Sequence, residues 1–413
     1  MRKFVALALI QLGFLAACGG GGGYGGGGGG PPPPPPMQVI ATPGMPNVEA
    51  MTVNAGPAGV NAVNTAYVSV TVCVPGTSTC KTIDHIEVDT GSIGLRIMSS
   101  VLSAAPAITL PAETDGSGIP LAECLQFADG TSWGSLAIAD LQLPVSGETA
   151  ANLHVQVIGD PAYPTVPTDC TGTPENTVVA FGANGILGVG PFIQDCGSAC
   201  VAAVTPLTVY YSCPSPSTCA AANASLAEQV PNPVSLFGTD NNGVIVELPA
   251  VGSAGSTTTS GSLVFGIGTR TNNGLGTATV LPEDPNTGWI SGTYKGTVYT
   301  NSYLDSGSNA NFFTDSSLTP CTSNPNFYCP ASTMSETATL KGTNAATLTA
   351  NFSVANADTL FSVTSYTAFS NLGGTNSNPA GFDLGLPFFY GHNVFTAIEN
   401  ANTPGGMGPY FAY

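Results

Sequence analysis

Two short segments of nearly identical composition constrain this chain more than any other feature of it. Asp89-Thr90-Gly91-Ser92 and Asp305-Ser306-Gly307-Ser308 each follow a stretch with β-forming residues, His85–Val88 and Asn301–Leu304 respectively. An apolar residue and a glycine come later in each half, in Ile186-Leu187-Gly188 and in Asp383-Leu384-Gly385. The same order in both halves predicts an internal duplication, in which each half supplies one carboxylate to a shared site.

The residue types around the two aspartates fit a pair of tight loops. Gly91 and Gly307 allow backbone N–H groups to approach a carboxylate closely. We expect the hydroxyls of the remaining loop residues to orient the two carboxyl groups; these are Thr90, Ser92, Ser306 and Ser308. Two carboxyls within hydrogen-bonding distance share one proton, and the monoanion can accept a proton from water while the other carboxyl polarises a carbonyl.

The N-terminus has the pattern of an export signal. Met1-Arg2-Lys3 is basic, and an apolar run from Phe4 to Ala17 follows it. The predicted signal peptide comprises residues 1–17. Leu15-Ala16-Ala17-Cys18, at its end, resembles a bacterial lipoprotein cleavage box and implies that Cys18 is lipidated. The alternative is an ordinary signal in which the cysteine lies there by chance. Gly19 provides no aspartate retention signal, so by this resemblance we expect the bacterial outer membrane as the location.

Residues 18–44 read as a tether that cannot form a core. Gly19–Gly30 is interrupted only by Tyr24, and six prolines follow from Pro31 to Pro36. A flexible glycine coil joined to a stiff polyproline rod spans roughly 40 Å when relaxed. We expect it to hold the body away from a lipid surface.

The charge balance excludes some partners. The chain of 413 residues has 25 Asp and Glu against seven Lys and Arg, a formal net charge of −18. Nucleic acid and anionic lipid surfaces are poor partners for such a field. The acidity suits work at acidic pH, and a role in solubility explains it equally well.

The cysteines indicate an oxidising compartment. Ten of the 11 cysteines remain when Cys18 is set aside, and an even count in an exported chain predicts five disulfides. Eight of them form near pairs in the sequence, Cys73/Cys80, Cys196/Cys200, Cys213/Cys219 and Cys321/Cys329, which leaves Cys124 and Cys170.

The rest of the sequence predicts a mainly β protein. Alternating runs between turn signals read as strands at 66–72, 136–141, 243–248 and 261–266. The clearest helical candidate is Asn223–Val230, which Pro231 would end. We place the boundary between the repeated halves there, with an N-terminal lobe over 45–232 and a C-terminal lobe over 233–413.

These motifs resemble those of the pepsin-like aspartic peptidases, from about residue 60 to the end. The family has an apolar residue and Asp-Thr-Gly-Ser in its first lobe, which Val88–Ser92 matches, and a second such motif that Asp305–Ser308 matches. The resemblance implies two β lobes, each a barrel or sandwich, with a cleft between them. It also implies that Asp89 and Asp305 are catalytic.

The family closes a hairpin flap over its substrate, and residues 126–134 occupy that place in the sequence. The resemblance implies that Phe127, Asp129, Gly130 and Trp133 belong to the flap or contact substrate. Many members have a tyrosine at the position of Phe127 and, at the position of Arg96, a tryptophan that binds its hydroxyl. Both are changed here, so we expect that hydrogen bond to be missing.

The expected function is that of a monomeric aspartic endopeptidase, which cuts extended peptides with apolar side chains next to the cut. The first alternative is a non-catalytic lipoprotein that binds peptide or glycan on the same scaffold, and the second is a surface adhesin without a cleft. We expect no cofactor and no metal site, because the three histidines, His85, His154 and His392, are scattered in the sequence.

Overall fold

The chain is mainly β. The structure is a computed structural model that describes residue 38 and residues 40–413. Within this range the strands belong to one large sheet, one smaller sheet and a two-stranded ribbon. The helices are short, namely α1 (Ser99–Ser103), α2 (Val178–Phe181), α3 (Ala357–Phe361), α4 (Leu386–Phe389) and the 3₁₀ turns η1 (Gly197–Cys200) and η2 (Pro233–Leu236).

The large sheet has 15 strands and draws on both ends of the described chain. Its order is β10-β9-β5-β6-β7-β4-β8-β3-β2-β1-β12-β11-β21-β24-β13, and a further β6–β2 pairing curls the first-half strands into a barrel-like form. The strands are β1 (Val48–Val53), β2 (Ala66–Cys73), β3 (Cys80–Asp89), β4 (Ile93–Met98), β5 (Leu121–Gln126), β6 (Thr131–Gln142), β7 (Thr149–Ile158), β8 (Gly185–Val189), β9 (Tyr210–Ser215), β10 (Thr218–Ala221), β11 (Gly243–Glu247), β12 (Thr259–Phe265), β13 (Val280–Pro282), β21 (Asn393–Ala397) and β24 (Tyr410–Ala412).

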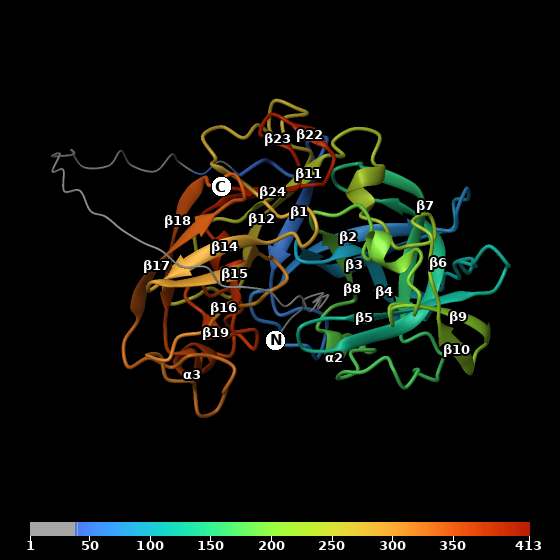
Figure 1. Cartoon of the computed structure of the whole chain (residues 1–413), viewed down its shortest axis with the longest axis horizontal. Coiled ribbons are helices and arrows are strands. Elements are labelled where there is room, and N and C mark those ends of the chain that lie inside the picture. The colour runs from blue at the N-terminus through green and yellow to red at the C-terminus, as the bar shows by residue number, and fades with distance from the viewer. Residues whose placement is uncertain (1–37, 39) are drawn as a thin grey trace.

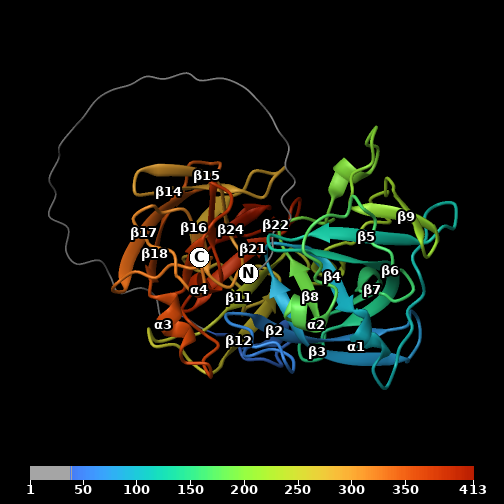
Figure 2. The same ribbon diagram turned by 90° about the horizontal axis from the view of Figure 1, so that it is seen from below.

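The smaller sheet comes from the second half alone. Its order is β18-β17-β14-β15-β20-β16-β19. It lies on the opposite side of the molecule from β5–β10 in both ribbon views, with β12 and β11 between the two groups (Figures 1 and 2). The strands are β14 (Ile290–Tyr294), β15 (Thr297–Leu304), β16 (Asn311–Phe313), β17 (Met334–Lys341), β18 (Thr347–Val354), β19 (Gly373–Thr375) and β20 (Gly381–Leu384), and β22 (Asn402–Thr403) and β23 (Gly406–Met407) form the ribbon.

The two halves repeat one arrangement of three strands. In the first half, β3 runs parallel to β8, and β4 runs antiparallel to β8. In the second half, β15 runs parallel to β20, and β16 pairs antiparallel with it. Each Asp-containing loop therefore connects a strand to its second neighbour, across the strand that contains the apolar-Gly element. This arrangement supports the duplication predicted from the sequence.

The core follows from the alternation of side chains along these strands. Val88 and Leu187 face the main apolar cluster from β3 and β8. In the smaller sheet, Phe382 packs against Phe313 and Tyr299 at centroid distances of 5.5 Å. Such burial stabilises by about 1.5–3 kcal/mol per large side chain, so both parallel strand pairs are firmly held.

The predicted strands at 66–72, 136–141, 243–248 and 261–266 correspond to β2, β6, β11 and β12. The predicted helix at 223–230 is wrong, because the chain there makes a single turn. Ser225 accepts from the Glu228 N–H at 2.9 Å, and the Glu228 carboxylate accepts from the Ser225 N–H at 2.7 Å. Ala224 and Val230 are both fully buried in one apolar cluster, so both ends of the segment are drawn into the core.

The five predicted disulfides are present. Four close the short loops, and Cys124–Cys170 is the fifth bond, between the two cysteines left over in the sequence. Cys124–Cys170 is therefore the one of these five disulfides that joins residues far apart in the sequence, and it connects β5 to the segment after β7.

The predicted boundaries need one correction. Gln38 and residues 40–44, predicted as the end of the tether, contact the body. Gln38 Nε2 donates to the backbone oxygens of Leu248 and His392 at 2.8 and 2.7 Å, and Ala41 N–H donates to Glu247 at 2.6 Å. The signal segment 1–17, Cys18 and most of the tether lie outside the described residues. Across the described part of the chain, the structure contains no helix with the length and apolar character needed to cross a membrane.

Candidate active site

The first Asp loop begins where β3 ends. The Asp89 carboxylate accepts from the Gly91 N–H at 2.7 Å and from the Ser92 hydroxyl at 2.6 Å. An aspartate that bonds two residues ahead forms a tight turn of its own backbone. Asp89 is fully buried, so both of these bonds fix its carboxylate within the protein.

The second Asp loop repeats these contacts atom for atom. The Asp305 carboxylate accepts from the Gly307 N–H at 2.8 Å and from the Ser308 hydroxyl at 2.9 Å. Asp305 is also fully buried. The structure therefore gives the two sequence-predicted aspartates the same local geometry.

The two loops are joined by a reciprocal set of hydrogen bonds. Thr90 N–H donates to Ser306 Oγ at 3.1 Å, and Ser306 N–H donates to Thr90 Oγ1 at 2.9 Å. Each hydroxyl then donates to a backbone oxygen of the opposite strand, Ser306 to Val88 at 2.8 Å and Thr90 to Leu304 at 3.2 Å. All the predicted supporting residues of the loops thus meet at one place.

The carboxyl groups lie beside each other, each over the glycine of the opposite loop. A Cβ atom built on Gly91 would lie 2.7 Å from Asp305 Cγ, and one on Gly307 would lie 2.6 Å from Asp89 Cγ. Only glycine leaves this space. Burial raises the pKa of Asp305 well above its ordinary range, and the charge of Asp89 and a hydrogen bond between the two side chains raise it further. Two carboxyls so placed hold one proton between them at mildly acidic pH.

The apolar-Gly elements pack directly behind the loops. A Cβ atom at Gly188 would lie 2.7 Å from the backbone of Ile93, and one at Gly385 would lie 2.5 Å from the backbone oxygen of Ser308. Glycine at both positions lets the strand that contains the apolar-Gly element approach the Asp loop closely. This close approach explains why the apolar-Gly element and the Asp loop occur together in each half.

Sequence analysis missed a third carboxyl beside the pair. Asp383 on β20 is fully buried, and burial raises its pKa well above the ordinary range. Its charge is one of the influences that raise the pKa of Asp305. The sequence contains a hint of this third carboxyl. The two apolar-Gly elements differ at their first residue, which is Ile186 in the first half and Asp383 in the second.

The hairpin 126–134 forms as predicted, with its turn closed by the Phe127 N–H, which donates to the Gly130 backbone oxygen at 2.7 Å. Phe127 is buried and meets Phe181 edge to face at 5.9 Å between ring centroids. Gly130 lies against Glu175, whose Cγ would be 2.5 Å from an added Cβ. The ring contact of Phe127 and the close approach of Gly130 to Glu175 therefore hold the turn of the hairpin in place.

Trp133 is placed differently from its predicted role. It is 2% exposed, its Nε1 donates to the Tyr163 backbone oxygen at 3.0 Å, and its ring packs on Tyr211. It is not among the described residues that line the pocket next to the hairpin. The period-two alternation of β6 turns Trp133 toward the disulfide Cys124–Cys170 and away from a substrate.

Arg96 has a structural role that sequence analysis also missed. Its guanidinium donates to both Glu123 oxygens at 3.1 and 2.7 Å and to Asp195 at 2.8 Å, and all three residues are almost completely buried there. Glu123 lies on β5, one strand of the hairpin. A buried ion triad thus connects β4, the hairpin and the segment after β8.

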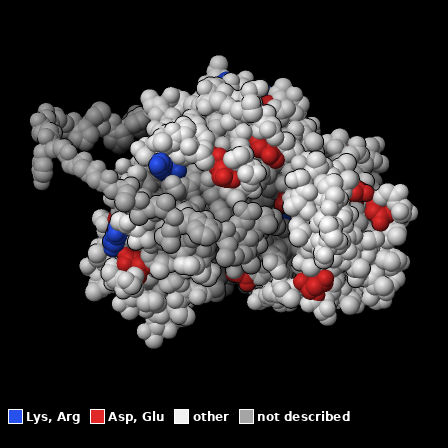
Figure 3. Space-filling view, viewed as in Figure 1, with Lys and Arg blue, Asp and Glu red and all other residues white. Residues whose placement is uncertain are grey.

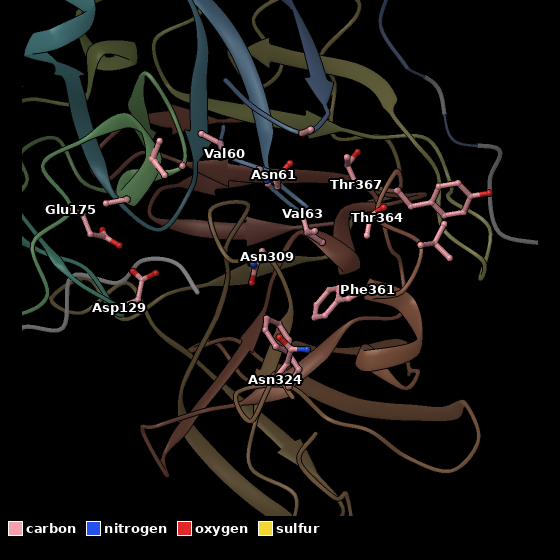
Figure 4. A pocket seen from close by; sticks show the side chains of 18 of the residues that line it. Val60, Asn61, Val63, Asp129, Glu175, Asn309, Asn324, Phe361, Thr364 and Thr367 are labelled. Carbon is pink, nitrogen blue, oxygen red and sulfur yellow. The ribbon is translucent and has the colours of Figure 1, made fainter. Parts of the chain in front are cut away.

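An open pocket of about 930 Å³ extends from the hairpin turn to the second half of the chain (Figure 4). Asp129 and Glu175 stand on one side of it, and Asn309, Asn324 and Phe361 on the other. Asn309 follows the second Asp loop directly. The pocket therefore joins the hairpin to the region of the two aspartates.

One group of potential metal ligands occurs among the described residues, formed by Cys321, Cys329 and Asp358. The two sulfur atoms form a disulfide, so they offer no thiolate to a metal ion. Within the described part of the chain, the groups gathered around Asp89 and Asp305 are carboxyls, hydroxyls and backbone amides, which suit proton transfer.

Comparison with known proteins gives a family without an assigned activity. No curated protein matches the chain. Residues 43–413, almost the whole described body, match the family described as protein of unknown function DUF3443. The chain therefore belongs to the DUF3443 family.

Proposed function

We propose that this protein is an aspartic endopeptidase with a two-lobed, pepsin-like fold. The observation that carries the proposal is the pair of interlocked loops, which bring one buried aspartate from each half into contact. The repeated three-strand arrangement, in which β3 and β8 correspond to β15 and β20, supports the two lobes. The seven-stranded sheet would form most of the second lobe.

The chemistry follows from the unequal protonation of the pair. Burial and the neighbouring charge of Asp89 raise the pKa of Asp305, so Asp305 keeps its proton to higher pH than an ordinary carboxyl and serves as the protonated member of the pair. The Asp89 carboxylate takes a proton from a water molecule, whose oxygen attacks the peptide carbonyl, while the Asp305 proton stabilises the developing oxyanion. When the C–N bond breaks, a proton passes from the pair to the amine that leaves.

The pocket beneath the hairpin fits an extended peptide. Its walls combine apolar side chains, such as Val63 and Phe361, with backbone and amide groups, such as those of Asn309. An extended chain needs both features, because its backbone must find hydrogen bonds and its side chains alternate to opposite sides. Asp129 and Gly130, at the turn, would lie over such a peptide.

The direct test is digestion of casein and of a peptide mixture between pH 3 and 6, with and without pepstatin. We expect cleavage that pepstatin blocks and that Asp89→Asn and Asp305→Asn each reduce by at least about 100-fold. Asp284→Asn, which changes an exposed turn carboxylate, is the matched control. Unchanged cleavage by Asp89→Asn would show that the pair of Asp89 and Asp305 is not catalytic.

Binding of peptide or glycan without hydrolysis is the second candidate. Phe127 has no hydroxyl, and Arg96 is occupied by its ion triad, so hydrophobic packing holds the hairpin. A stable complex with an intact peptide, together with no turnover at any pH, would favour this function.

We also propose that the protein is exported, lipid-anchored through Cys18 and held at the outer membrane. The leader sequence and the five disulfides support export. Over the face seen in Figure 3, Asp and Glu are scattered and Lys and Arg are few, and the anchor would therefore rely on lipid rather than on charge. Metabolic labelling with palmitate should mark the wild type and not Cys18→Ser.

A further inference from the structure

The position of Asp383 follows from the pairing of two strands. Asp383 on β20 lies opposite Tyr303 on the parallel strand β15, and Phe382 lies opposite Ser302. Paired residues of parallel strands point to the same side of the sheet, and neighbours along a strand alternate. Phe382 faces the aromatic core. Asp383 and Tyr303 therefore face the other side, which is also the side of Asp305, two residues after Tyr303.

This side of the sheet is packed less tightly than the other. Tyr303 is half-buried and packs at the margin of the main cluster, whereas Leu304 and Leu384, on the opposite side, are fully buried within it. The Leu384 backbone oxygen accepts from the Asp305 N–H at 3.0 Å. Asp383 precedes Leu384 in the chain and is therefore next to the residue that binds the second Asp loop. Asp383 thus lies beside the reacting position.

Asp383 is a buried carboxyl with little compensation from its neighbours. It is 0% exposed, and neither carboxyl oxygen has a hydrogen bond of good geometry among the described residues, although the Ser308 hydroxyl lies near enough to lower its pKa slightly against the effect of burial. The nearby Ser308 hydroxyl donates to Asp305 at 2.9 Å instead. A buried carboxyl in this state costs free energy, which a complementary group would recover.

The corresponding position in the first half has no acid. Glu87 pairs with Ile186 there, as Tyr303 pairs with Asp383. Each strand pair therefore presents one acid beside its aspartate. Asp129 and Glu175 line the pocket next to the hairpin, and none of the described residues that line it is basic. The lining of that pocket therefore contributes acidic groups and no cation.

We propose that Asp383 is a specificity-determining residue, which selects peptides with a lysine or arginine side chain next to the cleaved bond, on the side that lies over β15 and β20. This inference rests on the proposed peptidase function and replaces the expectation of apolar side chains on that side. An ammonium or guanidinium group would supply the donors that the Asp383 oxygens lack. On binding, the carboxyl would release its proton to solvent and form an ion pair beneath the substrate.

The test compares two peptide series that differ at a single position, with lysine, arginine, leucine or norleucine next to the cut. The variants are wild type, Asp383→Asn, Asp383→Leu and the control Glu283→Gln. Glu283 is another fully buried carboxyl without a hydrogen-bond partner among the described residues, and it follows β13 at the edge of the large sheet. Peptide affinity is measured separately by fluorescence anisotropy in the Asp89→Asn background, where no cutting is expected.

We expect wild type and Glu283→Gln to prefer lysine or arginine over norleucine at one flanking position by at least about tenfold. Asp383→Leu should lose this preference in both cleavage and affinity, and Asp383→Asn should reduce it. Wild-type cleavage with an apolar preference that Asp383→Leu leaves unchanged would overturn the inference and leave the peptidase function standing. Absence of any cleavage by wild type would instead overturn the proposed function, and equal affinity for lysine and norleucine peptides would overturn the inference alone.

Discussion

The backbone amide of Ser306 donates to the Thr90 hydroxyl at 2.9 Å, and the amide of Thr90 donates in return to the Ser306 hydroxyl at 3.1 Å, across 216 residues of sequence. Both residues are almost fully buried. This exchange is the contact that fixes the two halves of the chain at the position where their aspartates meet.

Loss of this contact should destabilise the protein. Ser306→Ala removes the acceptor of the Thr90 amide and the donor to the Val88 oxygen, and two buried groups without partners cost about 2–5 kcal/mol together. Urea unfolding measures the loss. Ser306→Thr should restore the stability, because Thr90 fills the equivalent place, and Thr82→Ala, which breaks an exposed hydroxyl pair, should cost less than about 1 kcal/mol. A Ser306→Ala variant as stable as Thr82→Ala would contradict the role of the contact.

The two loop glycines should be irreplaceable for activity. Alanine at 91 would place a methyl group 2.7 Å from Asp305 Cγ, and alanine at 307 would place one 2.6 Å from Asp89 Cγ. The carboxyls must then separate, and a shift of this kind costs about 100-fold in kcat/KM. Gly116→Ala, which meets nothing within 4 Å, is the control and should leave the rate unchanged. Full activity of Gly91→Ala would argue against a catalytic pair at this place.

Neutralisation of Asp383 should move the pH profile of cleavage. Burial, the charge of Asp89 and then the charge of Asp383 raise the pKa of Asp305. Asp383→Asn removes the third influence, so Asp305 would lose its proton at a lower pH. The basic limb of the profile for kcat should then shift to lower pH, whereas Glu283→Gln should leave it in place. A basic limb that stays where it is in the wild type would show that Asp383 does not act on the pair.

Stability should depend on pH through Glu247. Burial raises the pKa of Glu247 to about 7 from its ordinary 4.5, so the folded protein holds a proton that the unfolded chain releases. The stabilisation is complete below pH 4.5 and is lost as the pH rises through about 7, by up to about 3 kcal/mol. Glu247→Gln should flatten the fall in unfolding free energy between pH 4.5 and 7. An unchanged slope in urea titrations at these two pH values would contradict the assignment.

The buried ion triad should matter more for stability than exposed charges do. Arg96→Met leaves Glu123 and Asp195 facing each other without their cation, and broken buried pairs cost about 3–5 kcal/mol. The control Lys341→Met changes an exposed side chain and should shift the unfolding free energy by less than about 0.5 kcal/mol. Part of the Arg96→Met loss should be recovered in acid, because burial raises the pKa of Asp195 well above its ordinary value. Equal stability of the two variants would contradict the triad's role.

Elements that depend on local pattern could be predicted from the amino-acid sequence alone. The alternating runs gave β2, β6, β11 and β12, and the even cysteine count with its near pairs gave the disulfides. The repeat of an aspartate loop and its apolar-Gly element indicated the candidate site, because the same short motif of aspartate, glycine and hydroxyl residues recurs in both halves. The helix predicted at 223–230 failed for the opposite reason, since burial of Ala224 and Val230 outweighed local helix propensity.

The contacts that each side chain makes depend on the three-dimensional fold and could not be predicted from local pattern. The side chains of Arg96, Glu123 and Asp195 lie far apart in the sequence, and no local pattern marks them as a triad. Trp133 could be turned toward the core only by the register of β6. Asp383 gained its place beside Asp305 from the parallel pairing of β15 with β20. Contacts between distant strands depend on register, and register is set by packing of the whole sheet rather than by neighbours in the chain.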